Sequence, residues 1–190
     1  MKVGTKSVLF GAHQFAIHPW FVAAAWWKLY GFPADPRLWV AFFVHDIGYF
    51  GKPNMDGTEG EQHPHTGAWI MGRLFGREWH NFCLYHSRYV AKKDGAMPSK
   101  LCFADKLAIC ITPAWLYLPL ANLSGEIREY MKDARDLHYR RNNPEYNDQR
   151  IWYANMQKYV RSWLETHKNG AVDTWTPESR QGMDKYGVWK

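Results

Sequence analysis

The chain has 190 residues and a formal net charge of +6, with 24 Lys and Arg against 18 Asp and Glu. Aromatic residues make up 17% of the chain, which excludes an intrinsically disordered protein. Glycine and proline follow no period, so collagen-like and low-complexity classes are excluded as well. The length corresponds to one domain that can bury its own core. A charge of +6 over this length is weak evidence for a nucleic-acid groove, and we expect no stable nucleic-acid binding.

The cysteines indicate a reducing compartment. The number of cysteines is odd, and the sequence has no Cys-x-x-Cys pair; the three are Cys83, Cys102 and Cys110. Both observations argue against a disulfide framework and against a zinc ribbon. The N-terminus lacks the apolar stretch of a signal peptide. We therefore expect a cytoplasmic location.

An uncharged segment covers residues 107–125. Its length is close to the roughly 20 residues that a membrane span needs. Pro113 and Pro119 are expected to break it into a helix end and an irregular piece. We expect it to lie in the core or at a surface that faces a partner, without membrane contact, and a homodimer is one such partner.

The elements predicted from the pattern are all helices. The first covers 18–30, and the second follows Asp35, a candidate N-cap, and Pro36, and runs to His45. Residues 48–60 are rich in glycine and are predicted to be a polar loop. Further helices are predicted for 66–75, 78–92, 100–111 with Ser99 as cap, 125–139, and from 147 to a C-cap at Asn169-Gly170.

These elements predict an all-α fold, because no segment alternates as a strand would. We expect a single helical domain over 1–170 and an irregular aromatic tail over 171–190, which contains Trp175, Tyr186 and Trp189. The last helix carries an apolar stripe that is typical of core, made of Ile151, Trp152, Met156, Tyr159, Val160, Trp163 and Leu164.

Histidines and two unusual acids mark a candidate metal site. The first half of the chain contains most of the histidines, among them His18, His45, His63, His65, His80 and His86. Asp46 and Asp105 lie in apolar surroundings, where a carboxylate needs a compensating partner. A divalent metal is such a partner, and imidazole with carboxylate suits iron, manganese, zinc, nickel or cobalt. The adjacent pair His45-Asp46 can reach one ion at a helix end, or two ions through a bridging carboxylate.

The sequence His45-Asp46-Ile47-Gly48 resembles the signature of the HD-domain superfamily of metal-dependent phosphohydrolases. The resemblance covers residues 18–105 and includes His18 upstream, the element His63-Pro64-His65-Thr66-Gly67-Ala68, His86, and the stretch that ends in Asp105-Lys106-Leu107. It is closest to the six-ligand, two-metal members, the HD-GYP proteins and the small bacterial diadenosine tetraphosphate hydrolases. The chain departs from HD-GYP proteins at Tyr49, where they have lysine, and it lacks their Gly-Tyr-Pro, so cyclic-di-GMP activity is not supported.

The resemblance implies an HD-domain helical bundle, with additional C-terminal helices, that binds one or two divalent metal ions. It implies that one ion is held by His18, His45, Asp46 and Asp105, and a second by His63 and His86, with Asp46 bridging. It further implies hydrolysis of a phosphoester or phosphoanhydride, with a nucleotide as the expected substrate, by attack of a metal-bound hydroxide.

Several roles stay open in this interpretation. Asp46 or Asp105 orients the hydroxide, and His65 is the alternative to His63 as a ligand. Lys52 and Arg88 are the candidate phosphate contacts, with Lys92 and Lys93 as further candidates or as a solvated helix end. No chemistry is assigned to His13, His80, His138, His167 or the cysteines.

Two other functions are compatible with the same ligands. Some HD-fold proteins use a mixed-valent pair of iron ions to oxidise a carbon beside a phosphonate or a polyol. A non-catalytic module that senses a nucleotide is the other alternative, and the complete ligand set disfavours it.

Overall fold

The computed structural model describes residues 1–137 and 148–168, and for residues 133–137 only the backbone. This part of the chain contains ten α-helices, two short 3₁₀-helices and no strand, which confirms the all-α prediction. The helices are α1 (Val3–Phe10), α2 (His18–Tyr30), α3 (Pro36–Val44), α4 (Pro64–Phe75), α5 (Arg77–Leu84), α6 (Arg88–Lys93), α7 (Lys100–Ile111), α8 (Ala114–Ser124), α9 (Glu126–Leu137) and α10 (Gln149–His167); the 3₁₀-helices are η1 (Ile47–Tyr49) and η2 (Gly60–Gln62).

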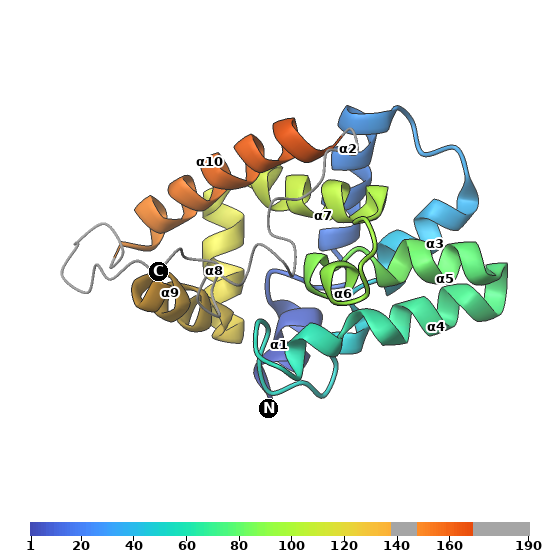
Figure 1. Ribbon diagram of the computed structural model, residues 1–190. Coiled ribbons are helices and arrows are strands. Elements are labelled where there is room, and N and C mark those ends of the chain that lie inside the picture. Colours follow the sequence, from blue (N-terminus) through green and yellow to red (C-terminus); the bar gives the residue numbers. More distant parts are fainter. Residues whose placement is uncertain (138–147, 169–190) are drawn as a thin grey trace.

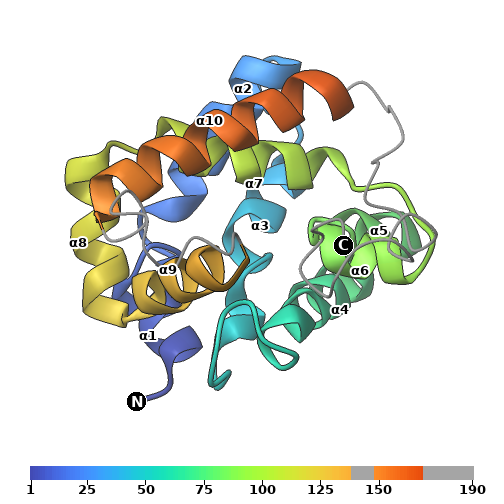
Figure 2. The ribbon, with the colours of Figure 1, turned by 60° about the vertical axis from the view of Figure 1, so that its left-hand side comes forward.

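The main core lies where α2, α3, α4, α5, α7 and α10 meet. Helix α2 packs on α7, and α4 and α5 form an antiparallel hairpin beside α3 (Figure 1). Figure 2 shows α10 lying across α7. Side chains with almost no exposure fill this core, among them Val22, Phe42, Met71, Leu101 and Cys102.

A second core joins α8, α9 and α10 through Tyr117, Ile127, Trp152 and Tyr153. A third, small cluster of Val8, Tyr49 and Met55 joins α1 to the segment that contains η1 and η2. Helix α1 was not predicted, since it buries Gly4, Thr5, Ser7 and Val8 and therefore shows no apolar stripe. It contacts η1, which directly follows Asp46.

Most predicted helices are found, some with corrected ends. Helix α2 has the predicted bounds, and Asp35 caps α3 by accepting a hydrogen bond from the Arg37 N–H at 2.9 Å. Ser99 occupies the N-cap position of α7, but its side chain makes no capping hydrogen bond. The loop predicted over 48–60 contains part of η1 and the start of η2.

The single helix predicted over 78–92 is wrong. Helix α5 ends at Leu84, and α6 begins at Arg88 after Ser87, whose hydroxyl accepts a hydrogen bond from the Val90 N–H at 3.3 Å. A serine at such a position favours a new helix start over continuation. The break places His86 between the two helices.

The irregular piece predicted after Pro113 is also wrong, because α8 continues as a helix through Pro119. No helix in the described ranges is by itself long and apolar enough to cross a membrane. Helices α7 and α8 reach that length and composition only as a pair, and the chain bends by 105° between them.

The predicted core stripe of the last helix is corrected in part. Trp152, Val160, Trp163 and Leu164 are buried, whereas Ile151 and Tyr159 are exposed. The predicted tail over 171–190, the C-cap at 169–170, and residues 138–139 and 147 at predicted helix ends lie outside the described residues.

Candidate metal centre

Six buried side chains, of which His45 and Asp46 are neighbours in the chain, lie close together. Their exposed fractions lie between 1% and 7%. They fall into two groups of potential metal donors that share one carboxylate: His18, His45, Asp46 and Asp105 in the first, and Asp46, His63 and His86 in the second. These are the six residues that the resemblance named as ligands.

The first group comes from the start of α2, the end of α3 and the middle of α7. His18 Nε2 lies 3.0 Å from Asp105 Oδ1 and 3.5 Å from Asp46 Oδ2. His45 Nε2 lies 3.1 Å from Asp46 Oδ2 and 3.8 Å from Asp105 Oδ1. Four donors thus surround one small volume.

The second group lies at the base of the α4–α5 hairpin. His63 directly precedes α4, and His86 follows the end of α5. Their Nε2 atoms are 3.0 Å apart, and they lie 3.6 Å and 3.4 Å from Asp46 Oδ1. The two oxygens of Asp46 therefore face different groups, Oδ2 the first and Oδ1 the second.

Three of the histidines share one local geometry. In His45, His63 and His86, ring Nδ1 lies 2.6–2.9 Å from a backbone carbonyl three residues earlier, that of Phe42, Gly60 and Cys83 respectively. A carbonyl oxygen can only accept, so Nδ1 carries the proton. The Nε2 atom of each ring is left free of that bond and lies among the donors of the centre, which is how ligating histidines are oriented.

The donor set fits a divalent metal. Asp46 Oδ2 and His45 Nε2 are buried and have no well-aligned hydrogen-bond partner within the described part of the chain. The Nε2 atoms of His63 and His86 face each other at hydrogen-bonding distance. A cation among these atoms would satisfy all of them, whereas their burial without one is costly.

The charges at the centre also favour a cation. Burial acts to raise the pKa of Asp46, but the neighbouring imidazoles, that of His45 foremost and then that of His86, lower it well below its usual value. Burial lowers the pKa of His45, and the nearby carboxylates, Asp46 foremost, raise it to about 10. The carboxylates thus attract positive charge to the position that His45 Nε2 faces, whether as a proton or as a metal.

The pKa values of Asp105 and His63 are also shifted by burial and by neighbouring groups. Burial acts to raise the pKa of Asp105, but the Lys106 ammonium, the hydrogen bond with His18 and the nearby His45 imidazole lower it well below its usual value. Burial and the neighbouring His86 hold the pKa of His63 well below its usual value, so its ring is neutral and able to ligate.

Glycines let the segments approach one another. A Cβ at Gly48 would overlap the His63 carbonyl oxygen, and a Cβ at Gly67 would lie 2.5 Å from the Val44 carbonyl oxygen. Gly48 thus allows η1 to lie against His63, and Gly67 allows α4 to lie against the end of α3. Tyr49 stacks on the His63 ring, with centroids 3.9 Å apart and an interplanar angle of 13°.

Two further polar features at the centre were not predicted. Lys106 Nζ lies 3.3 Å from Asp105 Oδ2, and its position beside a candidate ligand was a signal that could have found it. His13 Nδ1 lies 2.9 Å from Glu126 Oε2, and its ring centroid is 5.4 Å from that of His18. Burial lowers the pKa of His13, but the Glu126 carboxylate raises it to about 9. No sequence signal pairs residues 13 and 126.

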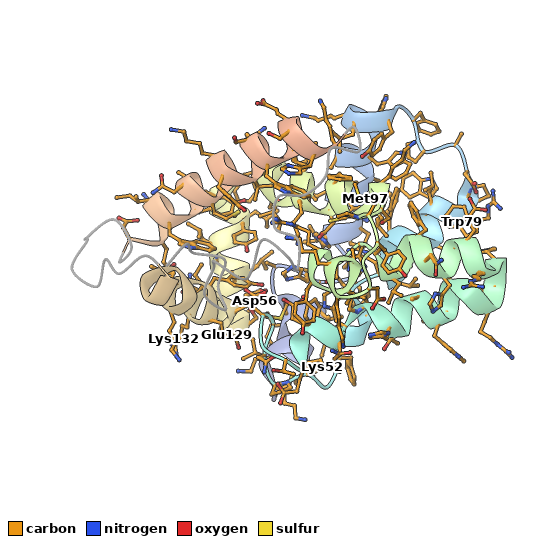
Figure 3. All side chains as sticks on the ribbon, viewed as in Figure 1. Lys52, Asp56, Trp79, Met97, Glu129 and Lys132 are labelled. Carbon is orange, nitrogen blue, oxygen red and sulfur yellow. The ribbon has the colours of Figure 1, made fainter. Side chains whose placement is uncertain are left out.

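The other candidates lie around this centre. His65 is exposed on the first turn of α4, so His63 is the histidine that joins the donor group. The Arg88 guanidinium lies over the Trp163 ring of α10, 4.4 Å from its centroid. Lys52 follows η1 and lies at the lower edge of the molecule in Figure 3. Lys92 is buried and Lys93 exposed. A contact of Arg88 or Lys52 with phosphate stays a prediction.

Comparisons with protein-family models, with curated proteins and with solved structures gave no match to this chain.

Proposed function

We propose that this protein is a metal-dependent hydrolase that cleaves a phosphoester or phosphoanhydride bond, with a nucleotide as the first substrate to test. The observation that carries the proposal is the position of Asp46 between two adjoining groups of buried donors. A pair of closely spaced divalent ions is a recurrent feature of phosphatases and nucleases.

Two groups of side chains would bind the metal ions. His18, His45, Asp46 and Asp105 would hold one ion, and Asp46, His63 and His86 a second. When bound, such ions activate a water molecule and neutralise the charge of a phosphoryl group. Asp46 fixes the two groups relative to each other, because each of its oxygens faces one of them.

Lys106 supports the same function. Its side chain is one-third exposed, at 34%, while its ammonium lies 3.3 Å from Asp105. Its ammonium can therefore contact a substrate oxygen at the surface of the centre while it stays close to Asp105. In the proposal, Lys106 adds positive charge for an anionic substrate beside the metal.

The cell compartment and partners belong to the proposal as well. The three cysteines are free and buried, which supports a cytoplasmic protein. A phosphorylated small molecule is the proposed partner, and a second copy of the chain stays a prediction.

The experiment is to load the full chain with manganese and to measure phosphate release from nucleotides, dinucleotides and simple esters. The test variant is Asp46→Ala, and the matched control is Asp94→Ala, which removes an exposed carboxylate. We expect activity in the wild type and in Asp94→Ala and its loss in Asp46→Ala. No release from any compound, with oxygen uptake by the iron-loaded protein, would overturn the proposal in favour of an oxygenase. Bound metal with neither activity would favour a sensing module.

A further inference from the structure

A groove follows the exposed side of the α4–α5 hairpin, which lies at the other end of the molecule from α8 and α9 (Figure 1). Its volume of about 510 Å³ lies within the range of small-molecule binding sites. Side chains of both helices, and that of the residue directly after α5, line the groove. Those that can contact a ligand through polar groups or rings are Trp69, Arg73, Arg77, His80, Asn81 and Tyr85.

The groove and the metal centre use different sides of α4. His63 directly precedes this helix and is buried among the other donors, whereas Trp69 and Arg73 are exposed. Along the helix axis, Trp69 lies roughly 9 Å and Arg73 roughly 15 Å beyond His63, at a rise of about 1.5 Å per residue. None of the donor residues is among the described residues that line the groove. A molecule bound there would therefore occupy a site of its own.

Two arginines give the groove a positive charge that no carboxylate in its described lining offsets. Arg73 and Arg77 are both exposed, and within the ranges 1–137 and 148–168 neither forms an ion pair. Arg77 is the first residue of α5, where the helix dipole disfavours a cation, and the neighbouring Glu78 does not line the groove. Both guanidinium groups are therefore available to the acidic oxygens of a ligand, which their N–H groups recognise in pairs.

Aromatic and hydrogen-bonding side chains lie beside the arginines. The indole of Trp69 is 63% exposed, and the partly buried ring of Tyr85 lines the same groove. An exposed aromatic face is a surface on which a nucleobase can stack. His80 and Asn81 are partly buried in the groove, and His80 Nδ1 lies 3.1 Å from Asn81 Oδ1, so each side chain restrains the other. Imidazole and amide groups can form hydrogen bonds with the polar edge of a base.

We infer that this groove is a nucleotide-binding site separate from the metal centre, in which Arg73 and Arg77 bind the phosphate oxygens and Trp69 stacks on the base. The positive charge selects an anion, the exposed indole selects a flat ring, and a nucleotide combines the two. The inference goes beyond the proposed function and does not depend on it, since neither a metal ion nor hydrolysis is required for binding in the groove.

The exposure of these side chains allows substitutions that leave the core intact. Arg73→Gln and Arg77→Gln each remove one guanidinium, and Trp69→Ala removes the indole. Arg150→Gln is the matched control for charge, because Arg150 is an exposed arginine of α10 outside the groove. His65→Ala is the matched control for the ring, because His65 is exposed on α4 one turn before Trp69 and does not line the groove.

The measurement is calorimetric titration of α,β-methylene-ADP, of inorganic phosphate and of adenosine into the manganese-loaded full chain, with the unfolding temperature of each variant measured alongside. We expect the nucleotide to bind more tightly than phosphate or adenosine alone. Arg73→Gln and Arg77→Gln should each weaken nucleotide binding about tenfold, as the loss of a charge-assisted hydrogen bond does. Trp69→Ala should weaken binding of the nucleotide but not of phosphate, and both controls should match the wild type.

A second measurement locates the bound nucleotide, because the metal centre is also a candidate site for it. A photoreactive azido derivative of ADP is crosslinked to the manganese-loaded chain, and the labelled peptides are identified by mass spectrometry. Label on the segment of α4 that contains Trp69 or on the segment that contains Tyr85 supports the inference, whereas label confined to other segments would overturn it.

Unchanged affinity in both arginine variants would overturn the inference, as would no nucleotide binding by the wild type. Phosphate binding as tight as that of the nucleotide would also overturn it, because the groove would then recognise an anion without a base. Failure of the proposed hydrolase is a separate result: the groove variants would show their pattern of affinities while no phosphate ester is cleaved.

Discussion

His63 Nε2 and His86 Nε2 face each other at 3.0 Å, and each ring is fixed by the hydrogen bond between its Nδ1 and a backbone carbonyl. Neither ring can turn away without losing that bond. A metal ion bound by both Nε2 atoms would join the two rings in the folded state. The stability of the fold should therefore depend on metal.

The first prediction concerns this pair. His63→Ala should lose the metal of the second donor group, whereas His65→Ala, which changes an exposed histidine two residues away, should keep it. The measurements are metal content after dialysis and the rise in unfolding temperature on adding manganese. A wild-type rise corresponding to about 2.7 kcal/mol is expected at a hundredfold excess over Kd. Equal metal content in both variants would contradict the assignment of His63.

The second prediction concerns the approach of η1 to His63. Gly48→Ala should destabilise the protein by about 1–3 kcal/mol, since its Cβ would overlap the His63 carbonyl oxygen and push the segments apart. It should also lower the metal content, because His63 moves with its backbone. Gly51→Ala is the control: it has φ of +85° and open space around it, so it strains the backbone without moving a ligand. Urea unfolding and metal analysis of both variants check this, and an unchanged metal content in Gly48→Ala would contradict it.

The third prediction concerns pH. Burial acts to raise the pKa of Glu126, but the His13 charge and several hydrogen bonds lower it below its usual 4.5. A carboxylate with a lowered pKa in the folded state stabilises the fold above its unfolded pKa, and this stabilisation is lost as the pH falls through the folded value. Glu126→Gln should therefore cost about 3 kcal/mol at neutral pH, with the difference from wild type shrinking below pH 4.5.

Urea unfolding of both proteins between neutral and acid pH measures that difference. The comparison with wild type cancels the titration of the other carboxylates, since these are present in both proteins. A difference that stays constant as the pH falls would show that Glu126 is not held ionised by its partners.

The fourth prediction concerns α8. Pro119 lies inside this helix and cannot donate a backbone hydrogen bond, so Pro119→Ala should raise the unfolding temperature. Pro113→Ala is the matched control, because Pro113 stands at the N-cap, where no intrahelical donor is required. An equal effect of the two substitutions would point to the unfolded chain as the source of the change.

The sequence by itself determined the helical class, several helix bounds and the residues of the donor set. Periodicity and local signals suffice for these: Asp35 and Pro36 place the start of α3, and histidines beside acids in apolar runs are rare enough to stand out. The resemblance then ordered six ligands, and the structure brings all six together.

Tertiary structure decided what depends on contacts between distant segments. The break at Tyr85–Ser87 places His86 opposite His63, although the local pattern favours one continuous helix. Helix α1 packs through the small residues Gly4, Thr5 and Ser7 together with Val8, rather than through an apolar stripe. The pairing of His13 with Glu126 joins positions 113 residues apart, and the role of either residue comes from the other. The hydrophobic periodicity of one segment can be read from the sequence, because it depends on neighbouring positions. The partner of a buried charge cannot, because it comes from a distant segment that only the fold places beside it.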